Sequence, residues 1–142
     1  MIRLPRKLDA AIRAEGEKTY PNECCGVLLG QIDDENVREV DEILPIDNAR
    51  DDGEQYHRFR IEADDFMRAE QLARQKGRDV LGFYHSHPDH PAEPSEYDRE
   101  YALPFYAYII VAVEKGRAAK LTSWELKLDR SRFETEPIEP IE

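Results

Sequence analysis

An apolar segment that runs into two histidines constrains this sequence more than any other feature. Val80 to Phe83 is an apolar run, and His85 and His87 follow it at alternate positions. Such a run predicts a β-strand that is rooted in the core. Because side chains two residues apart on a strand point to the same face, both imidazoles would be presented to one point. Gly82 has no side chain and would let a neighbouring backbone approach closely.

A short helix is expected to bring a carboxylate to the same point. The segment from Ser95 to Ala102 follows a proline-rich loop, and residues three apart on a helix share a face. Asp98 and Ser95 would therefore both look back toward the histidines. Two histidines and one carboxylate leave a fourth position open, which is the pattern of catalytic zinc sites. We predict one zinc ion, held by His85, His87 and Asp98.

The same Ser95-x-x-Asp98 pattern also has the form of a helix capping box, in which Asp98 would bind backbone amides. Hydrolysis at a zinc site further needs a general base. Glu23 opens an apolar strand, which would hold its carboxylate at a sheet end beside the metal. The Ser95 hydroxyl could donate a hydrogen bond to an oxyanion. The predicted catalytic residues are therefore Glu23 and Ser95.

Glu23, the segment His85-Ser86-His87-Pro88 and, six residues later, Ser95-Glu96-Tyr97-Asp98 together resemble the JAMM (MPN+) metalloprotease signature. The flanking segments resemble those of small stand-alone bacterial and archaeal members. The resemblance implies a fold similar to the cytidine deaminases, one zinc on the two histidines and the aspartate, the glutamate as acid and base, and the serine assisting. It also implies peptide or isopeptide cleavage after the C-terminal Gly-Gly of a ubiquitin-like or sulfur-carrier protein of the ThiS/MoaD type.

Two other functions stay open at this point. Family members that lack the metal are protein-binding scaffolds, and a peptidase could instead act on an unrelated peptide. The intact set of ligands favours the enzyme over the scaffold. A cytidine deaminase is disfavoured because the Pro-Cys-x-x-Cys ligand pair of those enzymes is absent.

The order of the periodic segments predicts an α/β fold, a mixed sheet flanked by helices, in one domain over residues 1–130. Helices are expected at 5–19, 63–76 and 95–102. Strands are expected at 23–32, 37–46, 56–61, 80–87, 106–114 and 118–128. A polar loop is expected at 47–54. Residues 131–142 are acidic and carry two prolines, so we expect a flexible C-terminal tail.

Composition restricts the partners. The formal net charge of −11 argues against nucleic acid, because phosphate binding needs a basic surface. No apolar run approaches the roughly 20 residues that a membrane span requires, so no membrane contact is expected. The basic N-terminal residues lack a signal-like apolar stretch, and we expect a cytoplasmic protein. The sequence does not distinguish a monomer from a homodimer.

The other cysteines and histidines are interpreted from their context. Cys24 and Cys25 are adjacent, so they cannot join distant segments by disulfides. We expect them to be buried structural thiols rather than redox or metal groups. His90 lies in the loop beside the predicted metal site, where substrate contact is one hypothesis and an ordinary loop residue the favoured one. His57 is expected at the surface.

Overall fold

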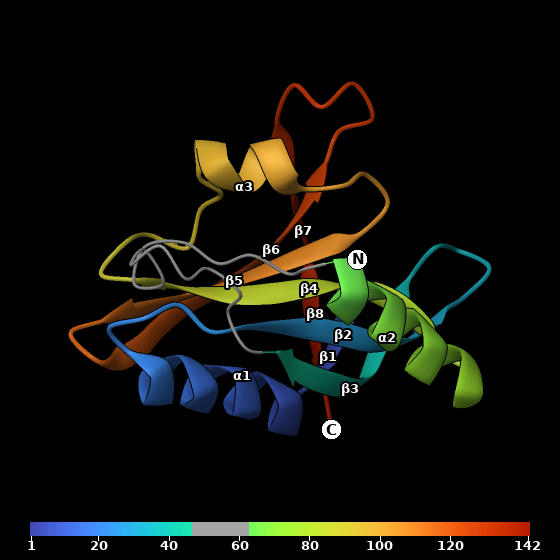
Figure 1. Cartoon of the computed structure of the whole chain (residues 1–142), viewed down its shortest axis with the longest axis horizontal. Coiled ribbons are helices and arrows are strands. Elements are labelled where there is room, and N and C mark those ends of the chain that lie inside the picture. The colour runs from blue at the N-terminus through green and yellow to red at the C-terminus, as the bar shows by residue number, and fades with distance from the viewer. Residues whose placement is uncertain (47–62) are drawn as a thin grey trace.

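Eight strands form one mixed sheet in residues 1–46 and 63–142, the ranges that this computed structural model describes (Figure 1). The strands are β1 (Ile2–Pro5), β2 (Cys25–Ile32), β3 (Arg38–Ile46), β4 (Asp79–Pro88), β5 (Ala107–Glu114), β6 (Arg117–Leu126), β7 (Phe133–Glu136) and β8 (Ile138–Ile141). The helices are α1 (Arg6–Thr19), α2 (Ala63–Gln75) and α3 (Glu96–Tyr101). The predicted α/β fold with a mixed sheet flanked by helices is confirmed.

Each helix and strand predicted within the described ranges is present, with ends that differ by a few residues. The sequence analysis does not predict β1, β7 or β8, because these four-residue strands are too short to show a clear period. The polar loop expected at 47–54 and the strand expected at 56–61, which contains His57, lie outside the described residues. No helix in the described ranges is both long and apolar enough to cross a membrane.

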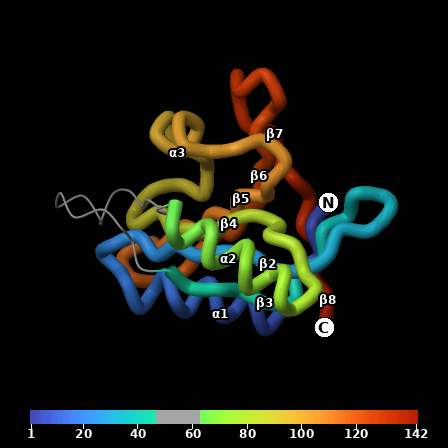
Figure 2. The backbone as a smooth tube through the Cα atoms, turned by 45° about the vertical axis from the view of Figure 1, so that its right-hand side comes forward, coloured from blue at the N-terminus to red at the C-terminus, as the bar shows by residue number. Residues whose placement is uncertain are grey.

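Alternate side chains of the central strands enter two cores on opposite faces of the sheet. On β2, Leu28 packs in one cluster with Ile12 of α1, whereas Val27 and Leu29 pack in another with α2. Figure 2 shows α2, in green, lying across β4 and β2. Strands that are covered on both faces read as continuous apolar runs, which explains the sequences of β2 and β4.

The strand β4 lies between β2 and β5 in the middle of the sheet. Its pairing with β5 is parallel and begins where Gly82 faces Ala107. A Cβ atom on Gly82 would lie 1.9 Å from the Ala107 carbonyl oxygen. The prediction that Gly82 permits close backbone approach is therefore confirmed, and the strand that carries the histidines is held on both sides.

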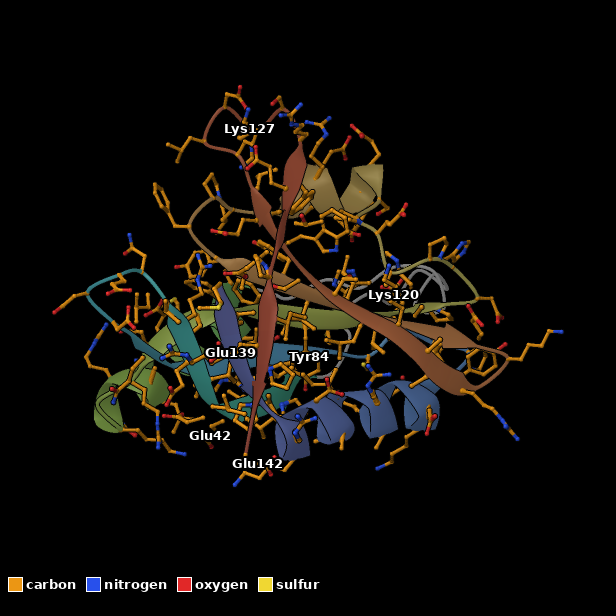
Figure 3. The ribbon with its side chains drawn as sticks, turned by 180° about the vertical axis from the view of Figure 1, so that it is seen from behind. Glu42, Tyr84, Lys120, Lys127, Glu139 and Glu142 are labelled. Carbon is orange, nitrogen blue, oxygen red and sulfur yellow. The ribbon has the colours of Figure 1, made fainter. Side chains whose placement is uncertain are left out.

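The C-terminal segment is not the flexible tail that its composition predicts. The strand β7 pairs antiparallel with β6, and β8, which begins after Pro137, pairs parallel with β1. Because β7 and β8 are the two edge strands, this segment joins the opposite edges and closes the sheet on itself. Figure 3, seen from behind, shows it running down to Glu142. Backbone pairing orders these residues, and an acidic composition does not reveal such pairing.

A buried ion pair lies where the edges meet. Arg38 on β3 places its Nη1 atom 2.5 Å from Oε2 of Glu136 on β7, and their side chains are 9% and 0% exposed. The Ser123 hydroxyl on β6 donates to the other oxygen of Glu136 at 2.8 Å. Arg38 also donates to the Phe105 carbonyl oxygen at 2.9 Å. The closure of the sheet therefore depends on a buried charged group with several partners.

Replacement of Glu136 by alanine should lower the free energy of unfolding by about 3 kcal/mol, because it leaves the buried Arg38 guanidinium with only the partly exposed carboxylate of Glu125, 3.3 Å away. Urea unfolding followed by circular dichroism measures the change. The control is Glu139→Ala on β8, which removes a half-exposed ion pair with Arg3 and should cost less than about 1 kcal/mol. Equal losses in the two variants would show that the buried pair does not hold the closure.

Candidate metal centre

Three side chains with metal-ligand atoms converge where β4 ends. The Nε2 atoms of His85 and His87 are 3.1 Å apart. Asp98 on α3 places Oδ2 at 3.2 Å from Nε2 of His87 and Oδ1 at 3.4 Å from Nε2 of His85. All three side chains are at most 8% exposed. The structure thus brings the three predicted ligands together, and they could hold a metal ion.

The spacing of these atoms fits a tetrahedral ion. Ligand atoms about 2.0–2.1 Å from a zinc ion, at tetrahedral angles, lie about 3.4 Å from one another. The separation of 3.1 Å between the two histidine nitrogens is close to that value, as are the 3.2 and 3.4 Å that separate them from the two different oxygens of Asp98. Two imidazole nitrogens and one carboxylate leave a fourth position for water or substrate. The donor set and its spacing therefore agree with a catalytic type of site rather than a closed structural one.

The loop after β4 fixes the orientation of His87. The Nδ1 atom of this ring lies 2.8 Å from the Pro91 carbonyl oxygen. A carbonyl oxygen only accepts, so Nδ1 carries the proton and the Nε2 lone pair faces the other ligands. The loop is itself anchored at Ala92, whose carbonyl accepts from the Thr122 hydroxyl at 2.7 Å and the Trp124 indole at 3.3 Å. The sequence analysis misses this contact because Pro91 contributes a backbone atom.

Asp98 serves the helix and the candidate metal centre at once. Its backbone N–H donates to Ser95 Oγ at 3.1 Å, and its Oδ2 atom accepts the Ser95 backbone N–H at 2.8 Å, which completes a capping box. The same Oδ2 atom faces Nε2 of His87. The two interpretations of the Ser95-x-x-Asp98 pattern are compatible, because a carboxylate oxygen accepts in two directions. The capping box fixes the rotamer of a predicted ligand.

The protonation states favoured at His85 and Asp98 are those that can bind a metal ion. Burial alone would raise the pKa of the Asp98 carboxyl, but the adjacent rings of His85 and His87 lower it below its usual value. Burial lowers the pKa of His85, and Asp98 only partly opposes that effect. A neutral imidazole and an ionised carboxylate are the forms that bind metal ions.

Glu23 lies two residues before the start of β2, the strand that pairs with β4. The Ser86 N–H donates to the Cys24 carbonyl oxygen at 3.1 Å, and the Cys24 N–H donates to Ser86 Oγ at 2.9 Å. If this antiparallel register were continued by one pair, Glu23 would fall opposite His87. Residues that face each other across antiparallel strands share a face of the sheet. Glu23 itself is buried, with 4% of its surface exposed.

Cys24 and Cys25 are buried free thiols. Burial raises the pKa of Cys24 to about 12 and also raises that of Cys25. A protonated buried thiol is a poor nucleophile and metal ligand. The cysteines therefore match the predicted structural role. His90 is exposed in the loop after β4 and stands apart from the three converging ligands.

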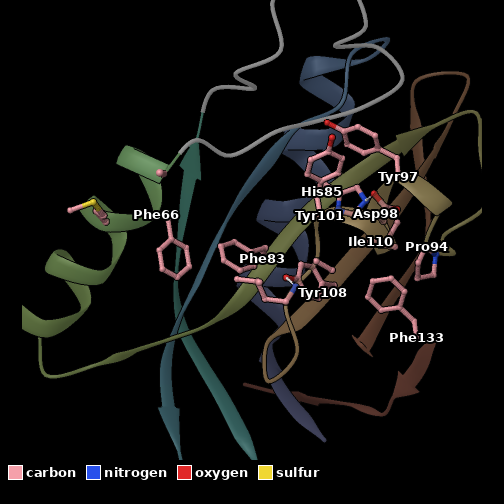
Figure 4. Close-up of a pocket in the computed structure, with 14 residues that line it drawn as sticks. Phe66, Phe83, His85, Pro94, Tyr97, Asp98, Tyr101, Tyr108, Ile110 and Phe133 are labelled. Atoms are coloured by element: carbon pink, nitrogen blue, oxygen red, sulfur yellow. Dashed lines mark hydrogen bonds and ion pairs between the residues drawn. The ribbon is translucent and has the colours of Figure 1, made fainter. Parts of the chain in front are cut away.

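An apolar cleft of about 430 Å³ begins at His85 and Asp98 (Figure 4). Residues of α2, β4, β5, β7 and the α3 region line it. The aromatic residues of its wall are Phe66, Phe83, Tyr97, Tyr101, Tyr108 and Phe133. Because Phe133 belongs to β7, the C-terminal segment that closes the sheet also contributes to the cleft beside the metal centre.

Comparison with protein families gives a match that covers most of the sequence. The model of the family described as prokaryotic homologs of the JAB domain matches residues 5–127. The chain belongs to this family. Among curated proteins, Desampylase from Haloferax volcanii is 35% identical over 91 residues, which are 63% of this chain and 62% of that protein. The match thus spans less than two thirds of the length of that relative.

Several solved structures share the fold of this chain. Protein DSY2949 from Desulfitobacterium hafniense superposes with a TM-score of 0.86 and 30% identity, over 100% of this chain and 94% of that chain. A protein from Salinibacter ruber gives 0.77 and 38% identity, over 100% and 92%. AF2198 from Archaeoglobus fulgidus, a JAB1/MPN domain protein, shares the fold with a TM-score of 0.61 at 20% identity, over 100% and 98%. The JAMM/MPN resemblance of the sequence is confirmed.

A protein loaded with zinc and then dialysed should retain about one ion per chain, since three ligands converge at one point. Replacement of His87 by alanine removes one ligand and should release most of the metal. Elemental analysis by mass spectrometry gives the ratio. His90→Ala is the matched control, a histidine three residues away that should leave the metal in place. Full zinc occupancy in His87→Ala would refute the assignment of that ligand.

Proposed function

We propose that this protein is a zinc-dependent peptidase or isopeptidase that cleaves after the C-terminal Gly-Gly of a ubiquitin-like or sulfur-carrier protein. The observation that carries the proposal is the convergence of His85, His87 and Asp98. The burial of Glu23, two residues before the start of β2, supports its assignment as the base. Similarity to Desampylase supports a small protein modifier as the substrate. We place the reaction in the cytoplasm, on a protein rather than on nucleic acid or a membrane.

In this proposal each side chain of the site has a separate chemical role. A zinc ion, when bound by the two histidines and Asp98, would supply Lewis-acid activation. Glu23 takes a proton from the water that adds to the scissile carbonyl carbon. It then gives that proton to the amine nitrogen as the C–N bond breaks. The Ser95 hydroxyl donates a hydrogen bond to the oxyanion, while the Ser95 backbone N–H holds Asp98.

The walls beside the centre favour a narrow substrate backbone. The loop from 89 to 94 is fixed through Ala92, which is 4% exposed and packs on Ile110 and Ala112. Because this loop is fixed, it leaves little room for a bulky side chain next to the scissile bond. Glycine has no side chain and threads where larger residues clash. The apolar cleft, which starts at the metal centre, would receive the part of the carrier tail that precedes the glycines.

Replacement of Glu23 by glutamine keeps the shape of the side chain and removes the base. We expect the variant to retain zinc and to lose turnover by roughly a hundredfold or more. Turnover is measured on a carrier-protein conjugate by intact mass, with zinc content determined on the same samples. Glu93→Gln, an exposed carboxylate in the loop after β4, is the control and should cleave like the parent. Parental turnover in Glu23→Gln would exclude Glu23 as the base.

The substrate itself gives a second test of the proposed function. A carrier protein that ends in Gly-Gly should be cleaved from its conjugate, and a matched carrier that ends in Gly-Leu should not. The reason is that leucine places a branched side chain against the fixed loop wall at the scissile bond. The ratio of kcat/KM for the two conjugates measures the selectivity. Equal values would show that the site does not select glycine.

A further inference from the structure

Asp89, the residue directly after β4, joins three segments at the metal end of the sheet. Its Oδ2 atom accepts the Tyr20 hydroxyl at 2.5 Å, and its Oδ1 atom accepts the Lys115 backbone N–H at 2.7 Å. Its own N–H donates to the Val113 carbonyl oxygen at 2.7 Å. We call these four residues the Asp89 junction. It connects the end of β4 with the end of α1 and with the turn between β5 and β6.

The junction reaches both sides of the candidate metal centre. Asp89 is two residues beyond His87, and Tyr20 is three residues before Glu23. The turn between Tyr20 and Glu23 is short and closed, since the Asn22 N–H donates to the Thr19 carbonyl oxygen at 2.8 Å and the Thr19 hydroxyl donates back to the Asn22 carbonyl oxygen at 3.1 Å. A displacement of Tyr20 is therefore passed on to Glu23.

The backbone of the junction is held in a conformation that side chains rarely adopt. Asp89 has φ of +55° and Lys115 has φ of +50°. Residues other than glycine keep such angles when their surroundings hold them there. The hydrogen bonds of the Asp89 carboxylate provide that support, because they engage the Lys115 N–H on one side and the Tyr20 hydroxyl on the other. Asp89 is therefore more than a solvated residue at a strand end.

We propose that Tyr20 and Asp89 are positioning residues, which set the distance between the Glu23 carboxylate and the metal ligand His87. The inference rests on the proposed function, in which Glu23 is the base. Both residues act through the backbone that they hold, and neither contacts the reacting atoms. A displacement of about 1 Å in a reacting group can lower a rate by up to about a hundredfold.

The test uses the zinc-loaded full chain and a fluorogenic peptide that ends in Gly-Gly-aminomethylcoumarin. Tyr20→Phe removes one hydroxyl and should lower kcat by about tenfold, with KM and zinc content unchanged. In a Glu23→Gln background the same change should have no further effect, because there is no base left to position. An equal loss in both backgrounds, or a loss of zinc in Tyr20→Phe, would overturn the proposal.

A matched control variant separates positioning from stability. Tyr84 on β4 (Figure 3) donates its hydroxyl to Glu15 Oε2 on α1 at 2.8 Å, so Tyr84→Phe breaks the same kind of bond outside the Asp89 junction. We expect Tyr84→Phe to lower Tm and to leave kcat at the parental value. Tyr20→Phe should instead lower kcat and leave Tm at the parental value. If kcat falls in proportion to Tm in both variants, Tyr20 has no positioning role.

Amide hydrogen exchange gives a readout that needs no turnover. Peptides covering 20–24 should exchange faster in Tyr20→Phe than in the parent, and at the parental rate in Tyr84→Phe. If the parent does not cleave the peptide, the proposed function fails, and the exchange rates alone decide whether the Asp89 junction holds the Glu23 turn. Unchanged exchange in Tyr20→Phe would overturn the inference.

Discussion

The carboxylate of Asp98 is the group on which the candidate centre depends. It caps the first turn of α3 through the backbone of Ser95, and it faces both histidines of β4. One side chain thus fixes where a short helix begins and where that helix meets the sheet. The histidines are held differently, because the strand that carries them is buried and the Pro91 carbonyl oxygen orients the His87 ring. A metal would therefore bind between a rigid strand and a helix that is oriented by its own ligand.

The rest of the fold keeps that strand in place. The strands β2 and β5 flank β4, and Gly82 allows the close pairing with β5. The C-terminal segment closes the sheet through the buried pair of Arg38 and Glu136 and brings Phe133 into the wall of the cleft. The strand β7 therefore contributes both to the closure of the sheet and to the wall of the cleft beside the candidate metal centre.

The sequence predicts the site better than it predicts the edges of the sheet. Spacing of two along a strand and of three along a helix is enough to bring His85, His87 and Asp98 together, because both periods are local properties of the backbone. The pairing of Glu136 with Arg38 joins residues 98 positions apart, and no local sequence pattern predicts it. The Tyr20–Asp89 contact spans 69 positions and is missed for the same reason.

We assign the metal to two imidazoles and one carboxylate, and we give the thiols of Cys24 and Cys25 no part in its binding. X-ray absorption at the zinc edge of the metal-loaded protein identifies the atoms around the ion. We expect nitrogen and oxygen neighbours at about 2.0–2.1 Å, with the multiple scattering of imidazole rings and no sulfur shell. A sulfur neighbour at about 2.3 Å would place Cys24 or Cys25 on the metal and would contradict the assignment.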